Sequence, residues 1–366
     1  MSDPRVDKLA HVLVTYSLGL RPGDQLFIET TPLAEELNLA VLREALQAGA
    51  HVFMQPVQPG SDEIFYEYAS QEQLSYASPA LKFIYENFDA SLFILAPQNT
   101  RALSSIDPTR VSRGKKARME AMQALYERSA RGTFKWCYTA FPTAALAQDA
   151  EMSLREYEDF VYGAGWLDRP DPAAAWREEE ERQQRLVDWL AGKKRVALKG
   201  KDIDLQLVIE GRSFVGGGAR ENFPSGEIFT SPVETSAQGW VRFTYPSIYG
   251  GQEVQGIELE FEAGKVVNER AAKGQALLTA LLDTDAGSRY LGELGIGTNY
   301  SIQRFTRNIL FDEKIGGTIH LAVGLGFEEA GGQNKSGIHW DMICDMSESE
   351  ITVDGELFYK DGKVVV

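Results

Sequence analysis

Apolar and polar residues follow two different periods in the first half of the chain. Residues 5–18 and 33–47 carry apolar side chains at the spacing of an amphipathic helix. A short apolar run follows each of them, at 25–29 and at 50–54, with the length of a buried strand. A strand, a helix and a second strand in this order form a βαβ unit, which predicts that the two strands pair in parallel.

The alternation continues to about residue 140. Residues 81–87 continue the helical pattern, residues 90–96 and 133–140 are strand-like, and a basic amphipathic helix is predicted over residues 111–129. Parallel sheets are covered by helices on both faces. The pattern therefore predicts a three-layer α/β domain with a mostly parallel sheet over residues 1–190.

Beyond residue 190 apolar and polar residues alternate with a period of two, as in strands. Before this change, the charged helical stretch at 177–182 is interpreted as a solvated helix face. Short strands separated by glycine-rich turns are predicted at 195–198, 203–209, 239–245, 255–261 and 265–267. One helix is predicted at 274–282, and two Asp-Gly turns predict hairpins near the end of the chain. Residues 191–366 are therefore expected to form a strand-rich α+β domain.

Length and charge narrow the class of protein. A chain of 366 residues is longer than one core usually supports, which agrees with two domains. A net charge of -16 excludes a nucleic-acid partner, since phosphates are bound by clustered Lys and Arg. There is no apolar run of membrane-spanning length and no signal-like segment, so no membrane association and a cytoplasmic location are expected. No phosphate-binding glycine motif follows the predicted strands.

Metal-binding residue types gather near the C-terminus. In a strand, His339 and Asp341 project to the same side while Trp340 points away. His320 lies in the middle of a strand-like run just upstream, so two of the four histidines fall close together. The pair of His339 and Asp341 is by itself equally compatible with a metal site and with a structural role.

Three carboxylates in the same region could complete a metal site. Two neighbouring divalent ions repel each other unless anionic ligands surround them, so a dinuclear site needs several acids. Glu227 follows a Pro-Gly turn, and Glu293 interrupts a run of glycine and apolar residues where a buried acid needs a partner. Glu313 is a weaker candidate, in a sequence that also fits a surface turn.

Five ordered sequence segments carry a family resemblance: 222–229, 291–299, 310–313, 320–324 and 334–341. With these segments the chain resembles the M29 (aminopeptidase T type) metallopeptidases. The resemblance implies a homodimeric two-metal aminopeptidase with an α/β N-domain and a partly closed β-barrel-like C-domain, acting on peptides with a free N-terminus. It places the metal ligands at Glu227, Glu293, His320, His339 and Asp341, with Glu313 as a possible additional ligand. Zinc is the expected metal, and cobalt and manganese are alternatives.

The chain departs from the family pattern at one position. The family commonly has a catalytic tyrosine seven residues after the first histidine, where this chain has Phe327. A phenyl ring cannot donate a hydrogen bond to a developing oxyanion. A hydroxyl from Tyr245, Tyr249 or Tyr300, the metals alone, or a weaker peptidase activity remain as alternatives.

The leading hypothesis is therefore metal-assisted peptide hydrolysis. The ions would bind the substrate amine, polarise the first carbonyl and activate a water, with Glu227 or Glu293 relaying a proton to the leaving amine. A His, His, Asp set also suits non-haem iron, as in ring-cleaving dioxygenases whose fold is similar, and this is the rival function. A metal-stabilised binding protein is the third interpretation.

Overall fold

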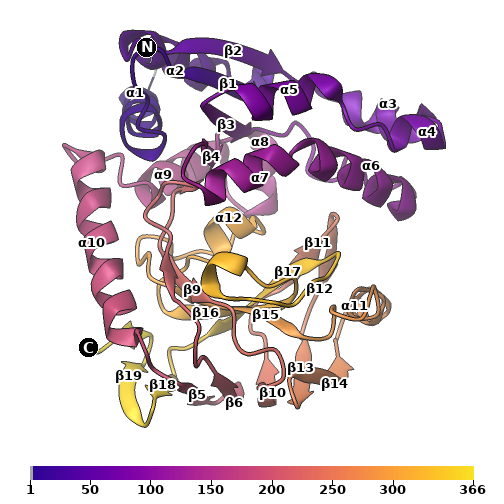
Figure 1. Cartoon of the computed structure of the whole chain (residues 1–366), viewed down its shortest axis with the longest axis vertical. Helices are drawn as coiled ribbons and strands as arrows, with labels where there is room; N and C mark the ends of the chain where they lie inside the picture. Colours follow the sequence, from indigo (N-terminus) through magenta and orange to yellow (C-terminus); the bar gives the residue numbers. More distant parts are fainter. Residues whose placement is uncertain (1–2) are drawn as a thin grey trace. The chain divides into compact units, whose positions relative to one another are not determined.

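A computed structural model describes residues 3–366 (Figure 1). By internal packing the chain divides into two compact units. The first contains the residues up to Ala175 together with Ala219–Pro224, and the second contains Trp176–Gly218 and Ser225–Val366. Helix α10 (Pro172–Leu190) runs through the first point of division, so the limits 1–190 and 191–366 stay a prediction.

The first unit is built on the parallel sheet that the sequence predicts. Its five strands are all parallel and are ordered β2 (His51–Pro56), β1 (Gln25–Thr30), β3 (Ala90–Leu95), β4 (Lys135–Ala140) and β8 (Asn222–Phe223). Leu26, Phe27 and Ile28 of β1 are fully buried although their side chains alternate between the two faces. Both faces of this sheet are therefore covered, as expected for parallel strands.

Helices of the first unit supply that cover. The helices of this unit are α1 (Pro4–Val12), the π-helix η1 (Leu13–Ser17), the 3-10 helix η2 (Pro32–Ala34), α2 (Glu35–Gln47), α3 (Ser61–Tyr68), α4 (Gln71–Leu74), α5 (Pro79–Asn87), α6 (Pro108–Ala121), α7 (Gln123–Ala130), α8 (Ala144–Asp149) and α9 (Leu154–Ala164). Tyr85 of α5 and Leu125 of α7 pack with Phe27 of β1 in one buried cluster. The single helix predicted over residues 111–129 is wrong in one respect. The chain tightens at Met122, whose N–H donates to the carbonyls of both Arg118 and Met119, and two helices result.

The second unit contains two antiparallel sheets and a hairpin. The eight-stranded sheet is ordered β14 (Lys265–Arg270), β13 (Glu258–Glu262), β10 (Gln238–Arg242), β6 (Ile203–Val208), β5 (Arg195–Gly200), β18 (Ser349–Val353), β19 (Glu356–Lys360) and β20 (Lys363–Val364). The five-stranded sheet is ordered β17 (His339–Asp345), β16 (Thr318–Gly324), β15 (Leu291–Gly297), β9 (Glu227–Thr230) and β7 (Val215–Gly216). The hairpin pairs β11 (Ser247–Tyr249) with β12 (Gln252–Val254).

One hydrophobic core joins the two larger sheets of this unit. It includes Leu205 and Ile351 from the eight-stranded sheet and Leu294 and Leu321 from the five-stranded sheet. Short helices complete the unit, namely α11 (Gln275–Leu282), α12 (Ile309–Asp312) and the 3-10 helix η3 (Glu328–Ala330). The strand-rich α+β class is confirmed. The strand pairing of the larger sheet runs from β14 to β20 and does not establish the partly closed barrel.

The two predicted Asp-Gly hairpins are present. Asp354 and Gly355 have φ values of 51° and 83°, and Asp361 and Gly362 have φ values of 48° and 79°. Two consecutive residues with positive φ are the signature of the tight hairpin turn that matches strand twist. These turns connect β18 to β19 and β19 to β20.

The interpretation of residues 177–182 as a solvated helix face is wrong for one residue. Glu179 of α10 is buried, forms an ion pair of 2.5 Å with Arg182, and accepts a hydrogen bond of 3.2 Å from the Thr298 hydroxyl. A charged sequence does not reveal which of its acids has a partner from a distant strand.

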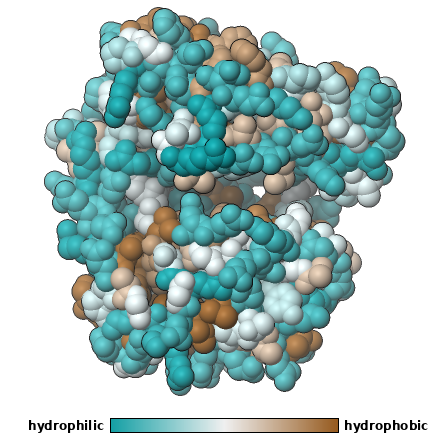
Figure 2. All heavy atoms as spheres, in the orientation of Figure 1, coloured by the Kyte–Doolittle hydropathy of each residue, from teal (hydrophilic) through white to brown (hydrophobic). Residues whose placement is uncertain are grey.

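The face of the molecule seen in Figure 2 is mainly hydrophilic. Within residues 3–366, no helix is both long enough and apolar enough to cross a membrane.

Candidate metal centre

The five-stranded sheet of the second unit brings five of the predicted site residues to one face. Its cross-strand pairs include Glu227–Gly297, Gly295–His320, Glu293–Ala322, Ala322–Asp341 and Gly324–His339. Directly paired residues of antiparallel strands project to the same face, and so do residues two apart on one strand. The side chains that the sequence placed on β9, β15, β16 and β17 therefore converge across the sheet.

The sixth predicted residue reaches the same place from a different element. Glu313 follows the short helix α12, and its carboxylate lies with His320 and Asp341 in a group whose ligand atoms are all within 4.8 Å of one another. We call the six residues together the acid–imidazole cluster: Glu227, Glu293, Glu313, His320, His339 and Asp341. Two further groups within the same distance are Glu227 with Glu293 and His320, and Glu293 with His339 and Asp341.

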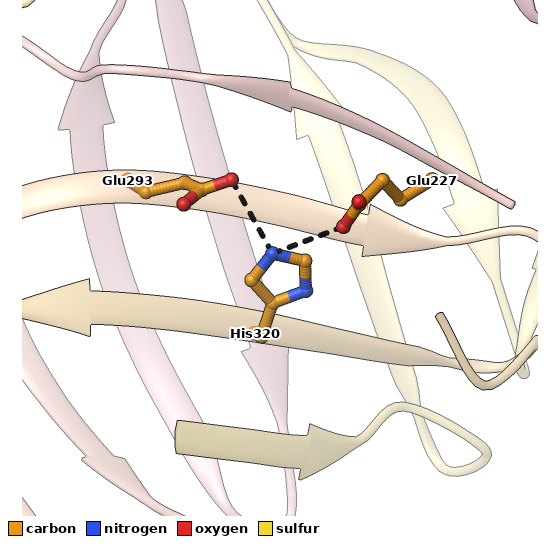
Figure 3. A group of neighbouring side chains, drawn as sticks. All are labelled: Glu227, Glu293 and His320. Carbon is orange, nitrogen blue, oxygen red and sulfur yellow. Dashed lines mark hydrogen bonds and ion pairs between the residues drawn. The ribbon is translucent and has the colours of Figure 1, made fainter. Parts of the chain in front are cut away.

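Glu293 lies between the two imidazoles. Its Oε1 is 3.4 Å from Nε2 of His320, and its Oε2 is 3.0 Å from Nε2 of His339. Figure 3 shows the first contact together with the approach of Glu227, whose Oε2 is also 3.4 Å from Nε2 of His320. One carboxylate thus offers an oxygen atom to each half of the cluster, which is how a bridging ligand holds two ions.

The second nitrogen of each imidazole is held by the backbone. Nδ1 of His320 is 3.0 Å from the carbonyl oxygen of Glu313, and Nδ1 of His339 is 2.8 Å from the carbonyl oxygen of Leu325. A carbonyl only accepts, so each Nδ1 carries the proton, and in the neutral ring Nε2 keeps its lone pair. Metal-bound histidines are commonly fixed in this way, with the free nitrogen aimed at the ion.

A glycine makes room for one of these rings. A Cβ atom on Gly295 would lie 2.0 Å from both Cε1 and Nε2 of His320. The imidazole therefore lies directly over the backbone of β15, and a side chain at this position would displace it. In the sequence, Gly295 stands in a run of glycine and apolar residues around Glu293, and nothing there indicates a contact with His320.

Lys314 also contacts the cluster, although it was not among the predicted site residues. Its side chain is fully buried, and its Nζ lies 3.2 Å from Oε1 of Glu227 and pairs with Glu313. A buried ammonium needs anionic partners, and here it compensates part of the charge of the cluster. The signal was present, because a lysine directly follows the candidate acid Glu313 in a segment rich in glycine and apolar residues.

The electrostatics of the cluster follow from burial and from charge pairing. Burial raises the pKa of Glu313 to about 8, with Glu227 and Asp341 adding to the rise and Lys314 opposing it. Burial also raises the pKa of Asp341, but the His339 imidazole overcomes this and lowers it to about 2. Burial lowers the pKa of His320, but hydrogen bonding to Glu293 and the nearby charges raise it to about 10. Without a metal, the protein therefore holds its imidazoles protonated among carboxylates.

These residues fit divalent metal ions. Oδ1 of Asp341 is buried and has no hydrogen-bond partner, although Nε2 of His339 is 3.5 Å away. Four carboxylates face one ammonium and two imidazoles, and carboxylate oxygen with imidazole nitrogen is a donor set of zinc, cobalt and manganese sites. The orphan oxygen and the shared Glu293 are both explained if cations occupy the cluster.

Phe327 lies beside the cluster. Its ring centroid is 4.8 Å from that of His339 and 5.4 Å from that of Phe229. Of the tyrosines considered as hydroxyl donors, Tyr300 donates its hydroxyl at 3.0 Å to the carbonyl of Gly362.

The other two tyrosines pack on aromatic rings. Tyr249 packs against Trp340, which projects from β17 to the opposite face from His339 and Asp341. Tyr245 stacks on Phe305. None of the contacts in the described part of the chain joins Tyr245, Tyr249 or Tyr300 to the cluster.

Comparisons with known proteins agree over the full length of the chain. The family model described as thermophilic metalloprotease (M29) matches residues 2–364. Aminopeptidase 2 of Geobacillus stearothermophilus is 29% identical over 402 aligned residues, which cover 99% of this chain and 95% of that protein. Aminopeptidase T of Thermus thermophilus is 27% identical and covers 98% of this chain and 95% of its own length.

Solved structures show the same fold. The structure of wild-type AmpT from Thermus thermophilus has a TM-score of 0.88 at 25% sequence identity, with 99% of each chain covered. The structure of 2,5-dihydroxypyridine dioxygenase from Pseudomonas putida has a TM-score of 0.62 at 14% identity, covering 100% of this chain and 98% of that one. At that identity the second likeness concerns the fold alone.

Proposed function

Because this chain belongs to the thermophilic metalloprotease (M29) family and is a metal-dependent aminopeptidase, we propose that the acid–imidazole cluster is its dinuclear catalytic centre. The observation that carries this proposal is the position of Glu293, which contacts both imidazoles while a backbone carbonyl holds the other nitrogen of each ring. Two divalent ions sharing Glu293 would satisfy both Nε2 atoms and the orphan oxygen of Asp341.

Each residue of the cluster then has a role. Glu227 and His320 would hold one ion, His339 and Asp341 the other, and Glu313 would be an additional ligand. When bound, the ions would polarise the substrate carbonyl and lower the pKa of a water, so that hydroxide is available for attack near neutral pH.

The protein contributes orientation and proton transfer. Lys314 holds Oε1 of Glu227, which leaves Oε2 facing His320. Glu227 or Glu293 would pass the proton of the attacking water to the leaving amine, as a carboxylate beside that water can do. Phe327 cannot donate a hydrogen bond, so the aromatic ring beside His339 contributes shape and exclusion of water instead.

The proposal extends to the identity of the metal, the class of substrate and the oligomeric state. Zinc is the proposed native ion, with cobalt and manganese as alternatives that the same donors accept. The substrates are peptides with a free N-terminus, and the chain is proposed to act as a homodimer, which light scattering in solution would test. The cytoplasmic location stays a prediction from the sequence.

The experiment that tests the function uses protein stripped with a chelator and refilled with zinc, cobalt or manganese. A panel of peptides and amino-acid anilides should release the N-terminal amino acid only after metal is restored. N-acetylated versions of the same substrates should not be cleaved. Metal-free protein with undiminished turnover, or one bound iron with oxygen consumption, would contradict the proposal.

Variants assign the ligands. His320→Ala, His339→Ala and Asp341→Ala should each lower metal-dependent turnover by roughly 100-fold or more, because each removes a proposed ligand from a buried site. His11→Ala is the matched control, since His11 is a solvent-exposed histidine that pairs with Glu44 on a helix surface. Full activity in any of the three cluster variants would remove that residue from the ligand set.

A further inference from the structure

The first unit contains a cavity of about 360 Å³ that lies against its parallel sheet. All of the residues that line the cavity belong to this unit, and it shares no residue with the acid–imidazole cluster. Sites for small molecules are commonly cavities of about 300–1,000 Å³. The cavity is therefore large enough for a small ligand, and the metal centre does not use it.

Strand register places one row of side chains at this cavity. Glu29 of β1 pairs with Phe93 of β3, Phe93 pairs with Tyr138 of β4, and Tyr138 pairs with Asn222 of β8. Paired residues of neighbouring strands project to the same face of a sheet. All four residues line the cavity, which is thus built across four strands.

The order of the strands marks the same place. The sheet is ordered β2, β1, β3, β4, so the chain moves from β1 to β2 in one direction across the sheet and then returns past β1 to β3. Open parallel sheets bind ligands where the strand order reverses in this way, towards the carboxyl ends of the strands. Glu29 is the last residue but one of β1 and pairs with Phe93 of β3, so the cavity lies at the reversal.

Two opposite charges lie side by side at the cavity. Arg118 of α6 uses one nitrogen, Nη2, to donate to both carboxylate oxygens of Glu29, at 2.9 Å and 2.7 Å. A guanidinium group has five N–H donors, and within residues 3–366 Nε and Nη1 of Arg118 donate to no other group. The side chains of Arg118 and Glu29 are 40% and 21% exposed, so a ligand can reach the pair.

Aromatic rings form much of the remaining wall. Phe93, Trp136 and Tyr138 of the sheet are half-buried, and Tyr126 of α7 is exposed. Such rings bind apolar and planar groups over a large contact area. The cavity therefore combines an apolar wall with a cation and an anion that are direct neighbours.

We propose that this cavity binds a free amino acid with an aromatic or large apolar side chain. The α-carboxyl group of an amino acid has a pKa of about 3.5 and its α-amino group one of about 8, so both are charged at neutral pH. The carboxylate accepts from the unused N–H groups of Arg118, the ammonium group donates to Glu29, and the side chain packs on the rings. In a peptide the two charged ends are at least one residue apart and do not match the adjacent pair. Free amino acids are the products of an aminopeptidase, so the site would fill as product accumulates.

Titration calorimetry with L-phenylalanine tests the proposal on the metal-loaded full-length protein. Because the metal centre can also bind an amine, the titration is repeated with His339→Ala, which removes a proposed metal ligand and no residue of the cavity. L-phenylalanine should still bind to His339→Ala. Adding Arg118→Gln or Glu29→Gln to this variant should weaken binding about tenfold or more, because a hydrogen bond between charged groups is lost.

A matched control and a conservative variant separate binding from folding. Lys82→Gln breaks the ion pair of Lys82 with Glu120, which is exposed and lies in the same unit, and should leave the affinity unchanged. Arg118→Lys keeps the positive charge with fewer donors and should retain part of the affinity. Thermal unfolding of each variant shows whether it is folded.

Ligand analogues test the charge pair without any substitution in the cavity. Compared with L-phenylalanine, 3-phenylpropanoate lacks the amino group, 2-phenylethylamine lacks the carboxylate and L-alanine lacks the ring. Each should bind to His339→Ala about tenfold more weakly or worse, because each loses one of the three contacts.

Two results would overturn the proposal. If His339→Ala abolishes binding of L-phenylalanine while Arg118→Gln alone keeps it, the amino acid binds only at the metal centre. If L-phenylalanine and either singly charged analogue bind to His339→Ala alike, the cavity does not recognise the paired charges. Hydrolysis of peptides by the metal-loaded protein is measured separately, so neither result decides the proposed function.

Discussion

At the scale of single residues, the site depends on which atom of each side chain is free. The carbonyls of Glu313 and Leu325 hold Nδ1 of His320 and His339, so Nε2 of each ring faces the carboxylates. Lys314 similarly engages Oε1 of Glu227 and leaves Oε2 facing His320. The chemistry of the cluster is therefore set by backbone carbonyls and an ammonium group, none of which is a proposed ligand atom.

Phe327 allows a gain of function to be predicted. Phe327→Tyr would place a hydroxyl beside His339, where the ring already lies, and supply a hydrogen-bond donor for the developing oxyanion. We expect kcat on a peptide anilide to rise by about tenfold or more, since loss of one such donor costs enzymes roughly 100-fold.

The control is Phe327→Leu, which removes the ring and adds no donor. It should not raise kcat. An unchanged kcat in Phe327→Tyr would show that a hydroxyl at this position does not reach the reacting carbonyl.

At the scale of elements, strand register assembles the site. Residues of β9, β15, β16 and β17 meet because opposed positions in an antiparallel sheet share a face. The imidazole of His320 lies over the neighbouring strand β15, which is possible only because the residue beneath it, Gly295, has no side chain.

Gly295→Ala should therefore damage both stability and metal binding. The added Cβ overlaps the His320 ring, which must shift, and overpacking of this kind costs about 1–3 kcal/mol of the free energy of unfolding. Denaturant unfolding and metal analysis of the purified variant measure the two effects.

Gly163→Ala is the matched control for this substitution. Gly163 lies in α9, and a Cβ atom there would meet nothing within 4 Å. It should change stability by no more than about 1 kcal/mol, in the stabilising direction expected for alanine in a helix. Equal metal content in Gly295→Ala and the wild type would show that the imidazole does not need its place over β15.

At the scale of the whole molecule, the two compact units should respond differently to metal. The acid–imidazole cluster belongs entirely to the second unit, and so does Lys314. Ions that bind the folded cluster stabilise it by mass action. Hydrogen exchange should therefore slow in β9, β15, β16 and β17 when metal is added, and change little in β1 to β4.

Metal affinity should also rise with pH. Because the pKa of His320 is raised to about 10 in the metal-free protein, an ion must displace a proton from this imidazole, and that displacement is easier at higher pH. Titration calorimetry at pH 6.5 and pH 8, in two buffers of different ionisation enthalpy, should show tighter binding at pH 8 and proton release. Affinity that falls over this interval would contradict the protonation states described for the cluster.

Much of the fold was accessible from the pattern of residues. Helical and strand periods predicted the parallel sheet of the first unit, and Asp354-Gly355 and Asp361-Gly362 predicted the hairpins that are present. The alternation of side chains between the two faces of a strand also predicted correctly that His339 and Asp341 share a face. These are local properties, because the backbone geometry of a few consecutive residues decides them.

The remaining features were decided by contacts between segments distant in sequence. From the sequence, Glu179 and Lys314 both resemble solvent-exposed residues. In the structure Glu179 is buried against Thr298, and Lys314 is buried against Glu227. The sequence by itself determined which residues could bind metal and which face of a strand they occupy. Only the tertiary structure decided that Glu293 contacts both imidazoles, because strand pairing and burial depend on the whole chain.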